Sequence, residues 1–493
     1  MNFGAQDEVV AFLASLEGAR DIVTTHISVV VIGESCAYKL KRAVRFPYLD
    51  FSTPPKRFAM CEREVALNRR FAPSLYIGAR RVTRTAHGAL ELDGGGALVD
   101  AVVMMRRFEQ DALLDNIARA GGLTRAMIEA LARRIAETHD AAPVDAERGG
   151  ATGLRRVLDG AEESSREAAA APPAEIEARF ALLREVLDTQ SARLDARRAQ
   201  GKVRRCHGDL TLRNICLLDG EPTPFDCLEF DDDIATVDVL YDLAFLLMDL
   251  WRIGERGFAN LALNRYLDAR EEADGLPLLP LFMALRATIR AHVEASQSHA
   301  DAARDYFALA GALLRPASPR IVAVGGFSGS GKSSVSAQVA HRLGAAPGAR
   351  TLNSDRLRKA MFGVVPTARL PQEAYASEVS ARVYARLFDE ATRIAALGWS
   401  VVVDAVLDRV EDRARIEEIA RAHGLRFDGF WLDAEDAQRV ARVEARRGDV
   451  SDATKDIALA QARREPGPMQ WTRIDASRTL ETSVAEIARA LET

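Results

Sequence analysis

The sequence predicts two domains that both mix helices and strands, an α+β domain followed by an α/β domain with a doubly wound parallel sheet. Two observations predict this order. Downstream of residue 320, short apolar segments alternate with amphipathic ones, which is typical of parallel strands joined by crossover helices. Upstream, strand-like segments lie near the N-terminus and most of the helical periodicity follows them. A chain of 493 residues is also too long for a single hydrophobic core.

The boundary between the two domains is predicted at RPASPR, residues 315–320. Two prolines and a serine there separate a helical segment, 301–314, from the abrupt apolar strand IVAVGGF, 321–327. We therefore expect a first domain over residues 1–315 and a second over residues 316–493.

Composition and charge narrow the classes of function. The net charge is −5 with acidic and basic residues interspersed, so a nucleic acid is not expected as a partner. The first 20 residues are acidic and amphipathic, unlike a signal peptide, and the absence of a run of about 18 uncharged apolar residues argues against a membrane span. The five cysteines lack CxxC spacing and are expected to be reduced and mostly buried, which favours a cytoplasmic protein. The oligomeric state is left open.

In the first domain, apolar segments predict strands at 27–33, 37–44 and 97–108. Helical periodicity and richness in Ala, Leu, Glu and Arg predict helices at 57–72, 124–139, 176–199 and 238–252. The polar segment 161–175 is expected to be a helix end or a linker, and the chain becomes strand-like again from residue 203.

In the second domain the alternation predicts five strands and four crossover helices. The strands are expected at 321–327, 350–354, 399–406, 426–433 and 471–477. The helices are expected at 333–344, 373–397, 411–422 and 436–447.

A glycine-rich loop follows the first strand of the second domain. Its sequence GFSGSGKS fits the spacing GxxxxGK[ST] and lies between an apolar strand and an amphipathic helix, as a phosphate-binding loop does. Glycines let backbone N–H groups converge on phosphate oxygens, the lysine reaches the β- and γ-phosphates, and the serine after it completes a Mg²⁺ shell. The residues expected to bind the nucleotide are Gly326, Ser328, Gly329, Ser330, Gly331, Lys332, Ser333 and Ser334, with Ser333 also a metal ligand.

Acidic and basic residues at other strand ends extend this site. Asp404 ends the buried strand VVVDA and is a candidate for orienting Mg²⁺ through water, the alternative being a carboxylate that caps a strand end. Asp355 and Arg358, in SDRLRKAMFG, follow the second strand and lie where a small acceptor would be held.

Over about 320–493 the chain resembles the P-loop kinases of small metabolites, the group that includes gluconate-type kinases and zeta toxins. The resemblance rests on GFSGSGKS, SDRLRKAMFG, VVVDA and RRGDVSDA. It implies that Asp355 binds or deprotonates the acceptor hydroxyl. It also implies that Arg442, Arg446 and Arg447 are lid arginines that close on the transferred phosphate, against the alternative of a solvated helix face.

The segment HGDLTLRN, 207–214, contains a second set of groups suited to phosphoryl transfer. Transfer to a hydroxyl needs a carboxylate that positions the hydroxyl, and an amide and a second carboxylate that hold Mg²⁺. Asp209 is predicted as the positioning base and Asn214 as a metal ligand, with His207 bracing the loop. Asp226, in PFDCLEF, is the candidate for the second metal carboxylate. Asp238 and Asp242 are expected to support the loop.

HGDxxxxN followed by FDCLEF and YDLAFLL resembles the aminoglycoside phosphotransferase family, whose fold is that of protein kinases. The resemblance covers roughly 20–300 and implies a protein-kinase-like first domain. It makes Lys39 the strand lysine for the α- and β-phosphates, with Lys41 as the rival, and Glu64 its partner, with Glu62 as second choice. The connector 104–108 would bind adenine. The glycine-rich loop that covers the phosphates in that fold is missing, since the turn here offers Gly33 alone.

Together these features predict a kinase with ATP and Mg²⁺ as cofactors, built from two nucleotide-binding modules, that phosphorylates a hydroxyl of a small molecule. One alternative is a nucleotide-gated regulatory or toxin-like protein whose kinase-like half is degenerate. Another is a polynucleotide 5′-hydroxyl kinase, which the acidic balance of the chain disfavours. The motifs do not identify the acceptor.

Overall fold

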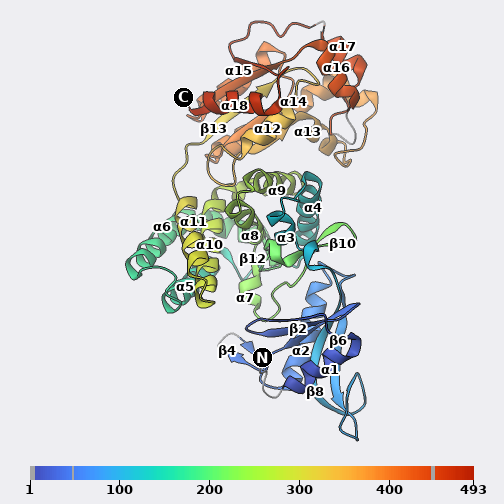
Figure 1. Cartoon of the computed structure of the whole chain (residues 1–493). Coiled ribbons are helices and arrows are strands. Elements are labelled where there is room, and N and C mark those ends of the chain that lie inside the picture. The colour runs from blue at the N-terminus through green and yellow to red at the C-terminus, as the bar shows by residue number, and fades with distance from the viewer. Residues whose placement is uncertain (1–5, 47–48, 446–449, 463, 493) are drawn as a thin grey trace. The chain divides into compact units, whose positions relative to one another are not determined.

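The structure is a computed structural model that describes residues 6–46, 49–445, 450–462 and 464–492 (Figure 1). The chain divides into two compact units, residues 1–249 and 250–493. Each unit is described by itself below.

The N-terminal part of the first unit is an antiparallel sheet with the strand order β1-β2-β3-β8-β6-β7. Its strands are β1 (Asp21–Thr24), β2 (Ser28–Ile32), β3 (Cys36–Lys41), β6 (Tyr76–Arg84), β7 (Leu90–Leu92) and β8 (Ala97–Arg106). Helix α2 (Pro54–Asn68) packs on one face through Cys61 and Val65, and helix α1 (Asp7–Glu17) packs on the other through Val9 and Leu13. The strands and the helix predicted here from the sequence are confirmed.

The remainder of the first unit is mainly helical. Its helices are α3 (Leu114–Arg119), α4 (Arg125–Ala141), α5 (Gly150–Glu167), α6 (Pro173–Ala199), α7 (Asp232–Ala235) and most of α8 (Val239–Arg252). Short antiparallel pairs join β4 (Arg45–Phe46) to β5 (Leu49–Asp50), β9 (Val203–Arg205) to β12 (Thr236–Asp238), and β10 (Ile215–Leu218) to β11 (Glu221–Pro224). Short 3₁₀ turns are η2 (Gln110–Ala112) and η3 (Leu212–Asn214). The hairpin β10–β11 separates the HGDLTLRN segment from Asp226, which brings the two ends of this stretch back together.

In the second unit, parallel strands form a sheet with the order β14-β15-β13-β16-β17. The strands are β13 (Arg320–Gly325), β14 (Arg350–Asn353), β15 (Val401–Asp404), β16 (Arg426–Asp433) and β17 (Thr472–Asp475). The helices that follow residue 320 are α12 (Lys332–Ala340), α13 (Ser354–Met361), α14 (Ser377–Ala396), α15 (Val410–Ala422), α16 (Asp436–Ala445), α17 (Lys455–Ala462) and α18 (Leu480–Glu492), with the 3₁₀ turn η5 (Gln372–Tyr375). The doubly wound parallel sheet predicted from the alternation is confirmed.

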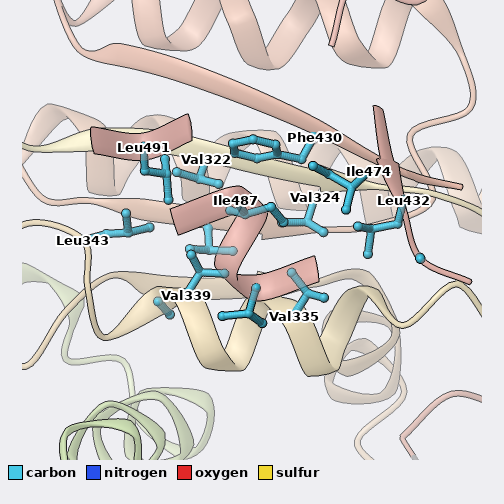
Figure 2. Packing of buried hydrophobic residues seen from close by; sticks show 14 of the residues in the cluster. Val322, Val324, Val335, Val339, Leu343, Phe430, Leu432, Ile474, Ile487 and Leu491 are labelled. Carbon is cyan, nitrogen blue, oxygen red and sulfur yellow. The ribbon is translucent and has the colours of Figure 1, made fainter. Parts of the chain in front are cut away.

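One face of this sheet is covered by α12 and α18 (Figure 2). Val335 and Val339 on α12 and Ile487 on α18 point toward Val324 and Leu432 on the strands. Strands buried on both faces have apolar residues at successive positions, which is why residues 321–324 of β13 and 401–403 of β15 are continuous runs of Val, Ile and Ala rather than alternating sequences.

Helices α9 (Arg256–Ala269), α10 (Leu279–Ser296) and α11 (Ala300–Leu313), with the 3₁₀ turn η4 (Ala273–Leu278), also belong to the second compact unit. The sequence places them in the first domain, ahead of residue 315. Their place in the second compact unit agrees with the contacts of α9, where Asn260 and Asn264 donate to the carbonyl of Ala349 at 3.0 and 3.1 Å, immediately before β14. The domain limits 1–315 and 316–493 stay a prediction.

One stretch of the described chain, Ala273–Ser296, is long and apolar enough to cross a membrane by length and composition. Its most apolar window is 72% buried inside the protein, as the core helix of a soluble protein would be. The five cysteines are buried, and none forms a disulfide.

Candidate functional site

The HGDLTLRN segment folds as a loop that ends in the 3₁₀ turn η3. The side-chain amide of Asn214 donates to Asp209 Oδ2 at 2.7 Å and to the Asp209 carbonyl at 2.9 Å. These two bonds fix the direction of the Asp209 carboxylate and bring the predicted base and the predicted amide ligand together.

His207 and Asp242 brace this loop from beneath. A ring nitrogen of His207 bonds the carbonyl of Phe225 at 2.9 Å, and burial lowers the pKa of His207, so the ring is neutral. Asp242 on α8 accepts from the backbone N–H of Gly208 at 2.7 Å and of His207 at 3.3 Å. Asp242 therefore supports the loop as expected. Asp238 instead pairs with Arg197 on α6 at 2.7 Å.

Asp226 follows β11 and has a backbone φ of 60°, which is rare for a residue with a side chain. Its N–H donates to the hydroxyl of Tyr76 at 3.0 Å, and its neighbour Cys227 donates to Asn68 Oδ1 at 2.8 Å. Strained backbone of this kind persists where surrounding contacts hold it, and here two buried side chains do so. The Asp226 carboxylate, 40% exposed, is thereby aimed at Lys39.

Lys39 on β3 and Glu64 on α2 form the ion pair that the sequence predicts, with 2.9 Å between Lys39 Nζ and Glu64 Oε1. Lys39 Nζ also lies 2.5 Å from Asp226 Oδ1. Glu64 is fully buried, and although burial alone would raise its pKa, the two neighbouring lysines lower it. The rival acid, Glu62, is exposed, which decides between the two glutamates.

Lys41 lies on the same face of β3 as Lys39 and contacts Glu64 as well, at 2.5 Å from Oε2. The second partner of Lys41 is Glu229, whereas the second partner of Lys39 is Asp226. The structure thus brings together Lys39, Glu64, Asp209, Asn214 and Asp226, joined by the bond from the Phe225 N–H to the Asn214 carbonyl. Tyr76, Asn68 and Glu229 are residues that sequence reasoning missed. Residues 104–106 are the last three of β8 and residues 107–108 follow it, and the role of this segment with adenine stays a prediction.

The glycine-rich loop of the second unit connects β13 to α12. Gly326, Gly329 and Gly331 have φ values of 142°, 85° and 91°, in the region that favours glycine. A Cβ at Gly329 would lie 2.4 Å from the carbonyl oxygen of Arg439, and one at Gly326 would lie 2.7 Å from that of Leu432. All three glycines are therefore favoured by backbone conformation, and Gly326 and Gly329 by close packing as well. Lys332 Nζ donates to the carbonyl of Phe327, within the loop, at 3.1 Å.

Asp404 ends β15 beside this loop, because β13 and β15 are parallel neighbours that pair Val324 with Asp404. Asn353, at the end of β14, donates to Asp404 Oδ2 at 2.7 Å and lies 3.3 Å from Ser333 Oγ. The other oxygen, Asp404 Oδ1, is buried without a hydrogen-bond partner. Burial raises the pKa of Asp404, and the nearby Lys332, Ser333 and Asn353 offset this only in part.

This arrangement fits a divalent cation. A buried carboxylate oxygen that lacks a partner is costly, and a serine hydroxyl and a carboxylate at the head of a phosphate-binding loop are ligands that Mg²⁺ prefers. Ser333 and Asp404 are the residues that would hold it. Asn353, which sequence reasoning missed, orients Asp404, and its position at the end of a strand was the available signal.

Asp355 and Arg358 both lie on α13, which begins directly after β14. Asp355 is half-buried, and its carboxylate makes no hydrogen bond or ion pair within the described chain. Arg358 is 6% exposed and is already engaged: it donates to the carbonyl of Ala374 at 2.6 Å and to Ser380 Oγ at 3.3 Å, and lies 4.8 Å from the ring centre of Tyr375. Its contact with an acceptor stays a prediction.

The described residues include one of the three predicted lid arginines, Arg442. Arg442 is half-buried in the last turn of α16, while Arg446 and Arg447 lie outside the described residues. Arg439 lies one turn earlier and was not singled out from the sequence. It is 3% exposed, and its guanidinium lies 5.2 Å from the centre of the Phe327 ring in the glycine-rich loop. It is the arginine that the described structure brings against the loop.

Comparison with known proteins gives a match in each half of the chain. Residues 43–276 match the model of a phosphotransferase enzyme family, and residues 321–466 match the model of an AAA domain. An uncharacterized protein of Mycobacterium tuberculosis is 29% identical over 481 residues, which cover 94% of each chain, and one of Mycobacterium bovis is similar to the same extent.

Several solved structures resemble parts of the chain. An APS kinase of Mycobacterium tuberculosis, in complex with AMPPNP and APS, is 22% identical over 36% of this chain and all of its own, with a TM-score of 0.26. A gluconokinase from Sinorhizobium meliloti is 23% identical over 36% of this chain and 96% of its own, with a TM-score of 0.26. A choline/ethanolamine kinase family protein from Mesorhizobium loti is 14% identical over 63% of this chain and 95% of its own, with a TM-score of 0.40.

Proposed function

We propose, from the premise that residues 43–276 form a phosphotransferase-family domain and residues 321–466 an AAA-type P-loop domain, that the protein is an ATP- and Mg²⁺-dependent kinase with two nucleotide-binding modules. Its acceptor is the hydroxyl of a small molecule. The observation that carries the proposal is the grouping of Lys332, Ser333 and Asp404 at the glycine-rich loop, with an unsatisfied carboxylate oxygen where a cation would be bound.

In the second module, Lys332 binds the β- and γ-phosphates after it leaves the Phe327 carbonyl, and Ser333 and Asp404 hold the metal. Mg²⁺, when bound, supplies positive charge that neutralises the phosphate oxygens. Asp355 accepts the proton of the acceptor hydroxyl. The oxygen of that hydroxyl bonds to the γ-phosphorus, and ADP leaves. The Asp355 carboxylate has no partner among the described residues, so it is available for that proton.

In the first module, Asp209 has the corresponding task. Asn214 bonds Asp209 Oδ2, which leaves Oδ1 to position and deprotonate a hydroxyl. Lys39 binds the α- and β-phosphates, held in place by Glu64, and Asp226 with Asn214 holds the metal. The mutual contacts of these groups support an active module over a degenerate one.

The experiment is transfer of γ-labelled phosphate from ATP into a fractionated bacterial extract, with small molecules, nucleic acids and proteins scored separately. Wild type is compared with Lys332→Ala, Asp209→Ala and the control Lys56→Ala, an exposed lysine of the first unit. Label is expected in a small molecule and is expected to fall about 10²-fold or more with one of the first two variants. The control is expected to keep full transfer.

The variant that loses transfer identifies the module that acts on that acceptor. Label that appears in no small molecule, or that survives in a protein carrying both Lys332→Ala and Asp209→Ala, would contradict the proposal. Label at 5′-hydroxyl ends of DNA or RNA would favour the polynucleotide kinase alternative. No label in any fraction, together with a stable protein partner in one nucleotide state, would favour the regulatory alternative.

A further inference from the structure

A second buried ion pair lies behind the Lys39–Glu64 pair of the first module. Lys41 contacts Glu64 Oε2 at 2.5 Å and also contacts Glu229 Oε1. The side chains of Lys41 and Glu64 are 0% exposed and that of Glu229 is 5% exposed. The five groups form one row in the order Asp226, Lys39, Glu64, Lys41, Glu229, closed at the Glu229 end and open to solvent at Asp226.

The charges along this row show what Lys41 contributes. Three carboxylates against two ammonium groups leave one excess negative charge, and the exposed Asp226 is the end that can present it to a cation. Without Lys41, Glu64 and Glu229 would be two buried carboxylates with Lys39 as the one remaining ammonium group in the row. Lys39 would then be needed to neutralise buried charge, which competes with its binding of phosphate.

The same contacts hold the metal-binding segment 226–229 against helix α2. Glu64 and Asn68, four residues apart, lie on one face of α2. Asn68 accepts from the Cys227 N–H at 2.8 Å, and Glu64 is linked to Glu229 through Lys41. Both carboxylate oxygens of Glu64 are thus occupied, so Glu64 keeps one anchor, Lys41, when Lys39 moves.

We propose that Lys41 and Glu229 are positioning residues of the first nucleotide site, which hold Glu64 and the segment 226–229 so that Lys39 can transfer from Asp226 to the phosphates of a bound nucleotide. This rests on the nucleotide-binding function proposed above. It assigns the two strand lysines different tasks: Lys39 touches the nucleotide, and Lys41 acts through Glu64.

The charge states of the two lysines agree with these different tasks. Burial would lower the pKa of Lys41, but Glu229 and Glu64 outweigh it and raise that pKa above its usual value. Burial likewise opposes the charge of Lys39, and Asp226 and Glu64 raise its pKa. Both lysines therefore stay charged at neutral pH, and the row acts as a fixed frame rather than as a pH switch.

The test uses the full chain with Lys332→Ala as background, so that the second module does not contribute nucleotide binding. Into it are placed Lys41→Met, the double change Lys41→Met with Glu229→Gln, and the control Lys56→Met. Lys56 also pairs with a carboxylate at 2.5 Å, that of Asp50, but its side chain is 51% exposed. The double change removes one positive and one negative buried charge and so restores the net charge of the row.

Three quantities are measured: the thermal midpoint, the affinity for a fluorescent ATP analogue with Mg²⁺, and the acylation of Lys39. For the last, an acyl-phosphate derivative of ATP transfers its acyl group to an amine beside the phosphates and releases ATP, and mass spectrometry locates the acylated lysine. In the background protein we expect acylation at Lys39 and not at Lys41.

Lys41→Met is expected to lower the thermal midpoint, to weaken nucleotide affinity at least tenfold and to reduce Lys39 acylation in proportion. In the double variant the thermal midpoint is expected to recover, while nucleotide affinity and Lys39 acylation stay low. If Lys41→Met does not fold, the double variant alone tests the positioning role. Recovery of all three quantities, or affinity within twofold of the background in either variant, would overturn the positioning role. A background protein that binds no nucleotide would instead overturn the proposed function of the first module, and this inference with it.

Discussion

At Asp404, the stability of the fold and the proposed metal-binding role oppose each other. Its Oδ2 accepts from Asn353 while its Oδ1 is buried without a partner, and burial raises its pKa. A carboxyl whose pKa is raised by folding destabilises the folded protein when ionised. That cost grows as the pH rises through the raised pKa and vanishes in acid, where the group is protonated. A bound cation would offset it.

The prediction is that Asp404→Asn stabilises the ligand-free protein above the pKa of Asp404 and weakens its response to Mg²⁺ with ATP. Unfolding in urea is followed by tryptophan fluorescence, since all four tryptophans lie in residues 250–493. At pH 8 the variant is expected to have the larger free energy of unfolding, and the difference should shrink as the pH falls. Mg²⁺ with ATP should stabilise wild type more than the variant.

Asp433→Asn is the matched control, because Asp433 also ends a strand of this sheet but its side chain is 58% exposed. It is expected to change the free energy of unfolding by less than about 0.5 kcal/mol. An Asp404→Asn protein that is less stable than wild type at pH 8 and responds equally to the ligand would show that Asp404 serves the fold and not a cation.

Residues inside a local motif were predictable from the sequence, and residues that act across the chain were not. Asp209 and Asn214 are five positions apart on one loop, so spacing alone indicated that they meet, and they do at 2.7 Å. Lys41 and Glu229 are 188 positions apart, and their pairing depends on how β3 faces the segment after β11. Spacing could nominate Lys41 only as a rival to Lys39, because a strand places i and i+2 on the same face.

At the scale of elements, strand β14 is an edge strand whose outer side is covered by helix α9. The side-chain amide of Asn264 donates to the Ala349 carbonyl at 3.1 Å and accepts from the Thr351 N–H at 2.7 Å. The side-chain amide of Asn264 thus makes the two backbone hydrogen bonds that a neighbouring strand would otherwise make. The alternation of segments predicted β14 and its parallel neighbours, but which helix covers its edge depends on contacts between segments 85 residues apart.

Asn264→Ala is expected to lower the free energy of unfolding of the second unit by about 1–3 kcal/mol, because it leaves the Thr351 N–H without its partner and removes one of the two amides that donate to the Ala349 carbonyl. Tryptophan fluorescence in urea measures it, as above. Thr392→Ala is the control in the same unit, since Thr392 is half-buried and its hydroxyl donates to the carbonyl of Phe388 at 2.8 Å within helix α14. Equal, small effects of the two changes would mean that Asn264 does not secure the edge of the sheet.

At the scale of the whole molecule, the chain has two candidate nucleotide sites that are built differently. The first relies on side chains from an antiparallel sheet, a helix and two loops, with Lys39, Glu64 and Asp226 in contact. The second relies on backbone, a loop of glycines with positive φ between a parallel strand and a helix. Because the two constellations share no residue, each should bind its own nucleotide, and a change in one should leave the other occupied.

Isothermal titration of the full chain with Mg²⁺ and a non-hydrolysable ATP analogue is therefore expected to give two nucleotides per wild-type chain. Lys332→Ala and Asp226→Asn are each expected to bind one, with the lost site weakened at least about tenfold, or 1.4 kcal/mol, and the combined variant none. One nucleotide per wild-type chain that is lost with Lys332→Ala but not with Asp226→Asn would make the first unit a supporting domain. The converse loss would make the glycine-rich loop a structural turn, in spite of its three positive-φ glycines and the unsatisfied oxygen of Asp404.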